Sequence, residues 1–187
     1  GGNPDNVDFI CGDAQRYGFS EGSFDAIFSR FGVMFFDDAT GAFRNLLCAL
    51  HPGGRLGFVC WRDLSENELD DLPLRAAASL LPPDLVSRTA SSGWFSFSRP
   101  ESLRRILVEA GFVDIQIASR DLGVHCGSLR ETVDVCTRVG AVGAIVRDRP
   151  HLMREAALAL EDALRERDGP DGPQLRAGVW IVTAGAP

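Results

Sequence analysis

The sequence predicts an α/β fold built around a sheet that contains a parallel crossover. Two short apolar runs, at 7–11 and 24–31, have the length of buried strands. The second run has apolar residues on both faces between its polar positions Asp25, Ser29 and Arg30, as in a sheet covered on both sides. A segment with apolar residues at helical spacing follows it, and the chain of 187 residues is long enough for one domain with a sizeable core.

The segment from 24 to 61 reads as one strand–helix–strand unit. Asp37 and Asp38 can cap a helix, and His51-Pro52-Gly53-Gly54 ends it and turns the chain. The third strand is then 55–61, and the short connections predict a right-handed parallel crossover. The apolar positions of the helix follow the spacing i, i+3, i+4, i+7: Phe43, Leu46, Leu47 and Leu50.

Residues 62–99 differ in composition and are interpreted as a cap or connector. The stretch is acidic at its start and then rich in Ala and Leu, with Pro73 suited to the first turn of a helix over 73–81. It continues through Pro82-Pro83 to the aromatic segment Trp-Phe-Ser-Phe at 94–97.

The remaining residues alternate between helix and strand patterns. Ser98 with Glu101, and Ser128 with Glu131, have capping-box spacing, which predicts helices that end at Gly111 and near residue 139. A further helix is expected at 150–167, before a Gly/Pro turn at 168–173. Strands are expected at 113–122 and 177–184.

Composition excludes several classes of function. The net charge of −7 argues against nucleic acid as a partner, and no apolar run approaches the roughly 20 residues of a membrane span. All 19 cationic residues are Arg, so no phosphate-loop or Schiff-base Lys exists. The five Cys and three His have no metal-site spacing. Cys11, Cys48 and Cys60 lie in apolar runs, which predicts a cytoplasmic protein with buried, reduced thiols.

Three motifs in a fixed order carry a family resemblance. They are Val-Asp-Phe-Ile-Cys-Gly-Asp-Ala-Gln at 7–15, Phe-Asp-Ala-Ile-Phe-Ser-Arg-Phe-Gly-Val-Met-Phe-Phe at 24–36, and Leu-His-Pro-Gly-Gly-Arg-Leu-Gly-Phe-Val-Cys-Trp at 50–61. Together they resemble the second half of the class I S-adenosylmethionine-dependent methyltransferases, in the small-molecule branch that includes the ubiquinone/menaquinone C-methyltransferases. The resemblance implies a Rossmann-like sheet without its first two strands, with a helical cap, in a single partial domain. That domain divides into a cofactor-side core at 1–61, the cap or connector at 62–99, and helices and strands at 100–187.

The resemblance also implies a cofactor, S-adenosyl-L-methionine, and residues that contact it. The Asp13 carboxylate would accept a hydrogen bond from the adenine amino group, the backbone N–H of Ala14 would donate to the ring, and Gln15 follows them. Ser29, Arg30 and Phe31 would approach the methionine end of the cofactor. Two alternatives stay open: Asp13 caps its own turn, and Arg30 forms a structural ion pair with Asp25 or Asp38.

On the acceptor side, Phe35 and Trp61 are the candidates, although a residue such as Phe35 more often belongs to the core than to a substrate wall. The helix at 73–81 and the aromatic segment at 94–97 would cover a small-molecule acceptor. No catalytic residue is assigned, because a sulfonium is already activated and in-line positioning supplies much of the rate. The amino-methyltransferase motif of nucleic-acid enzymes is absent after Phe28.

In this family a glycine-rich loop and an acidic residue hold the cofactor upstream of the third strand, and neither precedes residue 7 here. The chain begins at Gly1 without an initiator Met, so we expect a C-terminal portion of a methyltransferase. The strand at 7–11 then either pairs with 24–31 or belongs to a longer polypeptide. The alternative function is a non-catalytic methyltransferase-like domain used for protein contacts; a nicotinamide-binding protein is disfavoured because a glycine-rich loop is lacking. We expect marginal stability and weak cofactor affinity for the chain as given.

Overall fold

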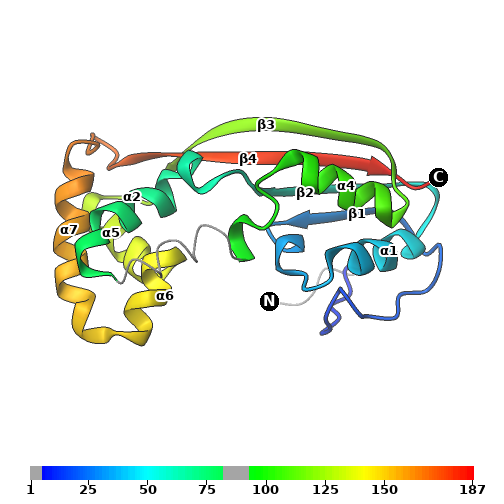
Figure 1. Ribbon diagram of the computed structural model, residues 1–187, viewed down its shortest axis with the longest axis horizontal. Coiled ribbons are helices and arrows are strands. Elements are labelled where there is room, and N and C mark those ends of the chain that lie inside the picture. Colours follow the sequence, from blue (N-terminus) through cyan, green and yellow to red (C-terminus); the bar gives the residue numbers. More distant parts are fainter. Residues whose placement is uncertain (1–5, 82–92) are drawn as a thin grey trace.

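The computed structural model describes residues 6–81 and 93–187, and its strands form an open mixed sheet (Figure 1). The sheet order is β1-β2-β4-β3, with β1 parallel to β2 and the other two pairings antiparallel. The predicted α/β class is therefore confirmed. The strands are β1 (Phe24–Arg30), β2 (Leu50–Trp61), β3 (Val113–His125) and β4 (Gln174–Gly185).

The predicted strand–helix–strand unit forms as β1, α1 (Ala39–Ala49) and β2. Asp38 is the N-cap of α1, and its side chain accepts a hydrogen bond from the N–H of Gly41 at 2.9 Å. β1 and β2 pair in parallel, with a register irregularity where the chain turns at Gly53, which has φ +80°. The carboxyl ends of both strands consequently meet at one end of the sheet.

Two helices cover one face of the sheet. They are α1 and α4 (Pro100–Ala110), which pack against each other and over the strands (Figure 1). Phe43 of α1 and Leu103 of α4 are completely buried against Phe58 of β2 and Val182 of β4. This aromatic and aliphatic cluster is the main core.

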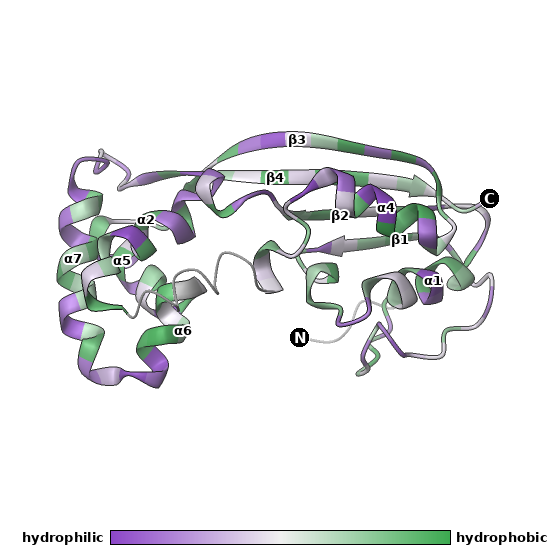
Figure 2. Cartoon of the chain, in the orientation of Figure 1, coloured by the Kyte–Doolittle hydropathy of each residue, from purple (hydrophilic) through white to green (hydrophobic). Residues whose placement is uncertain are grey.

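A second group of helices lies beyond the carboxyl ends of β1 and β2 (Figure 1). Leu74, Val142, Val146 and Leu160 form its buried core. Figure 2 shows both hydrophobic and hydrophilic positions along α7, as expected for a helix with one buried side. We call this group the helical cap; it comprises α2 (Glu68–Ala76), α5 (Leu129–Arg138), α6 (Gly140–Asp148) and α7 (Met153–Arg165). The helix α6 was not predicted.

The other face of the sheet is open in the described part of the chain. Phe28 is 72% exposed and Ile181 is 41% exposed, and both point to this face because paired residues share a side. The prediction of a sheet covered on both sides is therefore wrong for the described residues. Helices α1 and α4 bury only the opposite side chains of the same strands.

The apolar run at 7–11 is the clearest departure from expectation. It forms no strand, it does not pair with β1, and Phe9 and Ile10 are exposed. A strand needs a neighbouring backbone to satisfy its N–H and C=O groups, and within residues 6–81 and 93–187 β1 pairs only with β2. Cys11 lies in this run and is exposed. Cys48, on α1, is also exposed, contrary to prediction, whereas Cys60 is buried as predicted.

Several helix boundaries also differ from the prediction. The helix expected at 73–81 begins at Glu68 and ends at Ala76, with Pro73 inside it. Ser98 does not cap α4: Arg99 is the N-cap and makes no side-chain capping bond. Pro82-Pro83 lies outside the described residues. No described helix has the length and apolarity needed to cross a membrane.

Candidate functional site

An aromatic pair joins the carboxyl ends of β1 and β2. Phe31 has a left-handed backbone, with φ +57°, and its N–H donates to the carbonyl of Val59 at 3.0 Å. Its ring stacks on Trp61 with centroids 4.1 Å apart and planes 20° apart. A left-handed conformation is costly for a bulky residue, so the surrounding packing must hold this turn in place.

A pocket of about 390 Å³ opens beside this pair, between the sheet and the helical cap. Most of its lining is aliphatic or aromatic, and it draws on β1, β2, β3 and the cap helices. Ligand sites of open α/β sheets lie outside the carboxyl ends of parallel strands, which is where this pocket is. The lining residues are Arg30, Phe31, Trp61, Leu69, Asp70, Trp94, Val124, Val135, Cys136, Val139 and Gly140.

The aromatic segment at 94–97 contributes Trp94 to the wall. Trp94 meets Phe35 edge to face at a centroid distance of 5.4 Å, and the Ser96 hydroxyl donates to the carbonyl of Met34 at 2.7 Å. These contacts attach the segment to the residues that follow β1. Phe35 does not line the pocket and is 51% exposed, so it supports Trp94 and belongs to neither the pocket wall nor the core.

Arg30 makes neither of the ion pairs considered from the sequence. Asp25 lies at the other end of β1, where its carboxylate contacts His51 Nε2 at 2.6 Å, and Asp38 caps α1. The Arg30 guanidinium lies 5.3 Å from the centre of the Phe31 ring, a cation–π distance. Among the described residues, therefore, Arg30 is an exposed cation on the pocket wall.

The second charged residue of the lining is Asp70, on α2. It is only 8% exposed, and its carboxylate packs against Gly140, the first residue of α6. Burial, with smaller effects of Cys126 and Asp70, raises the pKa of the Cys136 thiol to about 12. Cys136 is thus a protonated, inert part of the wall at neutral pH.

The residues predicted for the adenine side do not line this pocket. Asp13 accepts a hydrogen bond from the N–H of Gln15 at 3.0 Å, so it caps its own turn. Gln15 Oε1 accepts from the N–H of Asp38 at 3.0 Å, and Asn45 donates to the carbonyl of Ala14 at 3.2 Å. The turn is anchored to α1, and the adenine contacts of Asp13 and Ala14 stay predictions.

Of the residues predicted for the methionine side, Arg30 and Phe31 line the pocket, while half-buried Ser29 lies beside Gly32. Trp61 also lines it, and its interpretation as a substrate-side residue stays a prediction. The cap residues of the lining were missed. Asp70 belongs to an acidic run that resembles a solvated surface, and no sequence signal marks the start of α6 at Gly140.

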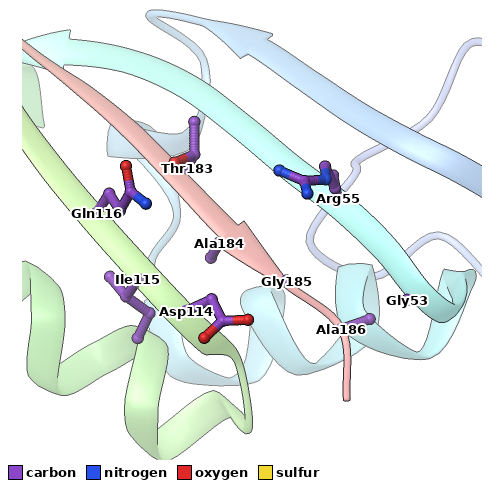
Figure 3. Close-up of a pocket in the computed structure, with 9 residues that line it drawn as sticks. All are labelled: Gly53, Arg55, Asp114, Ile115, Gln116, Thr183, Ala184, Gly185 and Ala186. Atoms are coloured by element: carbon purple, nitrogen blue, oxygen red, sulfur yellow. The ribbon is translucent and has the colours of Figure 1, made fainter.

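A second hollow, of about 450 Å³, lies near the amino end of β3 and the carboxyl end of β4 (Figure 3). Arg55, Gln116 and Thr183 line it from three neighbouring strands, together with Asp114, whose φ is +51°. It is polar and separate from the aromatic pocket. In the described ranges, no three His, Cys, Asp or Glu side chains are close enough to hold a metal ion.

Comparison with known proteins finds similarity to methyltransferases. A family model described as a methyltransferase domain matches residues 1–58. The ubiquinone/menaquinone biosynthesis C-methyltransferase UbiE of Pseudomonas aeruginosa is 31% identical over 115 residues, covering 57% of this chain and 45% of the relative. The demethylmenaquinone methyltransferase of Paenarthrobacter aurescens is 31% identical over 130 residues, covering 64% of this chain and 50% of the relative. The chain thus spans about half the length of these relatives.

Two solved structures have folds similar to that of this chain. The YcgJ protein from Bacillus subtilis has a TM-score of 0.56 at 17% identity, covering 97% of this chain and 71% of that one. A putative methyltransferase from Bacillus halodurans has a TM-score of 0.52 at 17% identity, covering 97% of this chain and 78% of that one. The methyltransferase-domain match thus covers the first 58 residues, and the fold of the chain is similar to that of these two solved structures.

Proposed function

We propose that this chain is the acceptor-binding part of an enzyme that transfers a methyl group from S-adenosyl-L-methionine to a small molecule. The observation that carries the proposal is the aromatic pocket at the carboxyl ends of β1 and β2, closed by the helical cap. The matched methyltransferase domain over residues 1–58 supports the reaction class, since it includes β1 and most of β2.

The described residues fit part of the cofactor. S-adenosyl-L-methionine, when bound, supplies a methyl group already activated on a sulfonium. Arg30 is an exposed cation with no carboxylate partner in the described chain, which suits the carboxylate of the methionine moiety. Asp13 is exposed and could take the adenine amino group with the carboxylate that caps its turn. No residue is assigned to the ribose hydroxyls.

The pocket residues would position the acceptor and keep water away from it. The Phe31–Trp61 pair presents aromatic surface, and Trp94 and the cap close the other sides. Holding two reactants in line converts an encounter into a near-unimolecular step, so methyl transfer needs little further help from side chains. The inert Cys136 thiol in the wall does not compete as a nucleophile.

The shape and chemistry of the pocket favour an apolar, ring-containing acceptor. Flat aromatic walls stack well on planar rings, and a volume of about 390 Å³ accommodates one small bicyclic molecule. The names of the curated relatives refer to quinone biosynthesis, which is compatible with such a ring.

A labelled-methyl assay tests the proposal. The protein is incubated with saturating S-adenosyl-L-methionine carrying a labelled methyl group and a reduced naphthoquinone, and the product is identified by mass spectrometry. We expect labelled product, and a reduction of tenfold or more in Trp61→Ala, which removes the aromatic wall. Phe28→Ser on the open face is the control and should retain activity.

Two results would contradict the proposal. Equal turnover by Trp61→Ala and the unchanged chain would show that the pocket is not the acceptor site. Absence of both product and a calorimetric response to S-adenosyl-L-methionine, from a chain that is folded, would favour the non-catalytic methyltransferase-like domain instead.

A further inference from the structure

Four polar side chains around the hollow at the end of β4 are free of partners (Figure 3). They are those of Arg55 on β2, Asp114 and Gln116 on β3, and Thr183 on β4. All four residues are exposed, and within residues 6–81 and 93–187 none of these side chains makes a hydrogen bond or an ion pair. The hollow therefore presents a cation, a carboxylate, an amide and a hydroxyl that a ligand can reach.

The floor of the hollow between Arg55 and Asp114 is Gly185 of β4. Gly185 pairs with Arg55 on one side and with Val113 on the other. A Cβ at this glycine would meet Val113 and Asp114 only at ordinary distances of 3.7 Å or more, and its backbone is not left-handed. Neither packing nor backbone conformation therefore requires glycine here. A glycine inside a strand weakens it and often marks a place where a ligand approaches closely.

A β-bulge places the Asp114 carboxylate beside this floor. The pairing of β3 with β4 shifts register between Val113 and Gln116, and within the bulge Asp114 has a left-handed φ of +51°. Its Oδ2 atom lies 4.0 Å from the position that a Cβ of Gly185 would occupy. A left-handed backbone is uncommon for residues other than glycine, and bulges on edge strands commonly re-aim a side chain. The bulge thus turns a negative charge toward the open space above β4.

Arg55 and Asp114 carry opposite charges on opposite sides of the hollow, and they do not pair with each other. β4 lies between their strands, so their backbones are about 10 Å apart. A ligand lying across Gly185 can meet both, because a carboxylate accepts from the guanidinium and an ammonium group donates to the Asp carboxylate. Thr183 and Gln116 offer further hydrogen bonds from the same face. A ligand with negative charge alone would be repelled by Asp114.

We propose that this hollow is a second binding site, which takes a small zwitterion with a carboxylate at one end and a primary ammonium group at the other. Arg55 binds the carboxylate and Asp114 binds the ammonium group, across the floor formed by Gly185. The site is separate from the aromatic pocket, because Arg55 and Trp61 are six residues apart on β2, which corresponds to about 20 Å of strand. It is therefore independent of the proposed methyl transfer.

Nuclear magnetic resonance titration of the isotope-labelled chain tests the site. The probe is 4-aminobutyrate, compared with butyrate, which lacks the ammonium group, and butylamine, which lacks the carboxylate. We expect saturable shifts of the Thr183 and Gly185 amide signals, and binding of 4-aminobutyrate about threefold to tenfold tighter than of either single-charge probe, since an exposed ion pair adds a modest increment. Asp114→Asn, which tolerates the left-handed backbone, should bind 4-aminobutyrate no better than butyrate. Arg55→Gln should bind it no better than butylamine.

Arg120→Gln is the matched control, because Arg120 is also an exposed Arg of the sheet but lies outside the hollow. It should keep the preference of the unchanged chain. Butyrate binding as tightly as 4-aminobutyrate to the unchanged chain would overturn the proposal in favour of a site for anions alone, and equal binding of butylamine in favour of a site for cations alone. Absence of saturable binding of 4-aminobutyrate would also overturn it. These comparisons need no variant to fold and no cofactor, so their outcome is distinct from that of the methyl-transfer assay.

Discussion

At the scale of single residues, the site depends on a backbone conformation that its sequence does not favour. Phe31 adopts a left-handed φ of +57° at the end of β1, and the contacts that hold it there are its bond to the Val59 carbonyl and its stack on Trp61. Residues held in sparsely populated regions are common at binding sites, where the surrounding structure maintains them. The strain is thus located where the pocket needs a fixed aromatic wall.

Replacing Trp61 should expose the energetic role of this stack. We expect Trp61→Leu to lower the free energy of unfolding by about 1–3 kcal/mol, because both the aromatic contact and buried surface are lost. Urea denaturation followed by circular dichroism measures the change. Trp94→Leu is a useful comparison, since Trp94 is more exposed and its edge-to-face contact with Phe35 should contribute less. A larger loss in Trp94→Leu would be inconsistent with this account.

Glu68 gives a residue-scale prediction about pH. Its carboxylate accepts bonds from Arg167 Nη2 and the N–H of Arg176, each at 2.8 Å, and it is 6% exposed. Burial alone would raise the pKa of Glu68, but the bonds from Arg176 and Arg167 outweigh it and lower the pKa. A depressed pKa in the folded state stabilises the fold above the unfolded pKa and loses that contribution as pH falls through the folded value.

We therefore expect Glu68→Gln to lower the free energy of unfolding at pH 7 by about 1–3 kcal/mol, since a charged partner of two Arg is replaced by a neutral one. The variant should also lose less stability than the unchanged chain between pH 5 and pH 3, because a Glu side chain takes up its proton at about pH 4. Urea titrations over this range measure both effects. Parallel pH profiles for the two proteins would show that Glu68 does not carry this dependence.

At the scale of elements, two helices with the same Ser–Glu capping-box spacing begin in different ways. Ser128 and Glu131 form the predicted capping box at α5, whereas Ser98 and Glu101 do not form one at α4. Pro100 occupies the first turn of α4, so the helix starts one residue later, and the Ser98 carbonyl accepts from Trp180 Nε1 instead. Local spacing predicts a cap only where tertiary contacts leave the capping residue available.

The cap of α5 should be worth about 1 kcal/mol. Ser128→Ala removes the hydroxyl that accepts from the N–H of Glu131 and should destabilise the chain by about that amount. Ser98→Ala is the matched control and should have almost no effect, because its side chain does not cap a helix. Thermal or urea unfolding of the two variants makes the comparison. Equal losses would contradict the difference between the two helix starts.

The elements that sequence patterns located well are those with strong local signals. Apolar runs, an Asp cap and a Pro-Gly-Gly turn predict β1, α1 and β2. The pocket residues Arg30, Phe31 and Trp61 lie at the ends of these strands, so the sequence locates them too. Asp70 and α6 were missed because their role depends on contacts between segments far apart in the chain. The strand expected at 7–11 failed because an apolar run forms a strand only beside a paired edge.

At the scale of the whole molecule, the open sheet face distinguishes this chain from a fully covered α/β sheet. Phe28 and Ile181 are exposed on it, and β1 pairs on one side only within the described ranges. An open edge next to exposed apolar side chains favours association with other chains. In the described residues, one face of the sheet is therefore packed against helices, and the other exposes apolar side chains to which another chain can bind.

This surface predicts concentration-dependent self-association of the chain. Phe28→Ser should reduce it measurably while changing the free energy of unfolding by only about 0.5 kcal/mol, because the side chain is 72% exposed. Analytical ultracentrifugation over a range of concentrations measures the effect. Val108→Ser, on the exposed side of α4, is a control that should leave association unchanged. Association that is equal in both variants would place the contact elsewhere.

The pocket brings together parts of the chain that are distant in sequence: the end of β1, the end of β2, the segment at Trp94, β3 and the cap helices. A molecule bound there touches the sheet and the cap at once, so it binds only when both are folded and docked. Binding and folding are then thermodynamically linked, and a ligand at a hundred times its dissociation constant would add about 2.7 kcal/mol to stability. A bound acceptor would therefore stabilise the packing of the helical cap against the sheet.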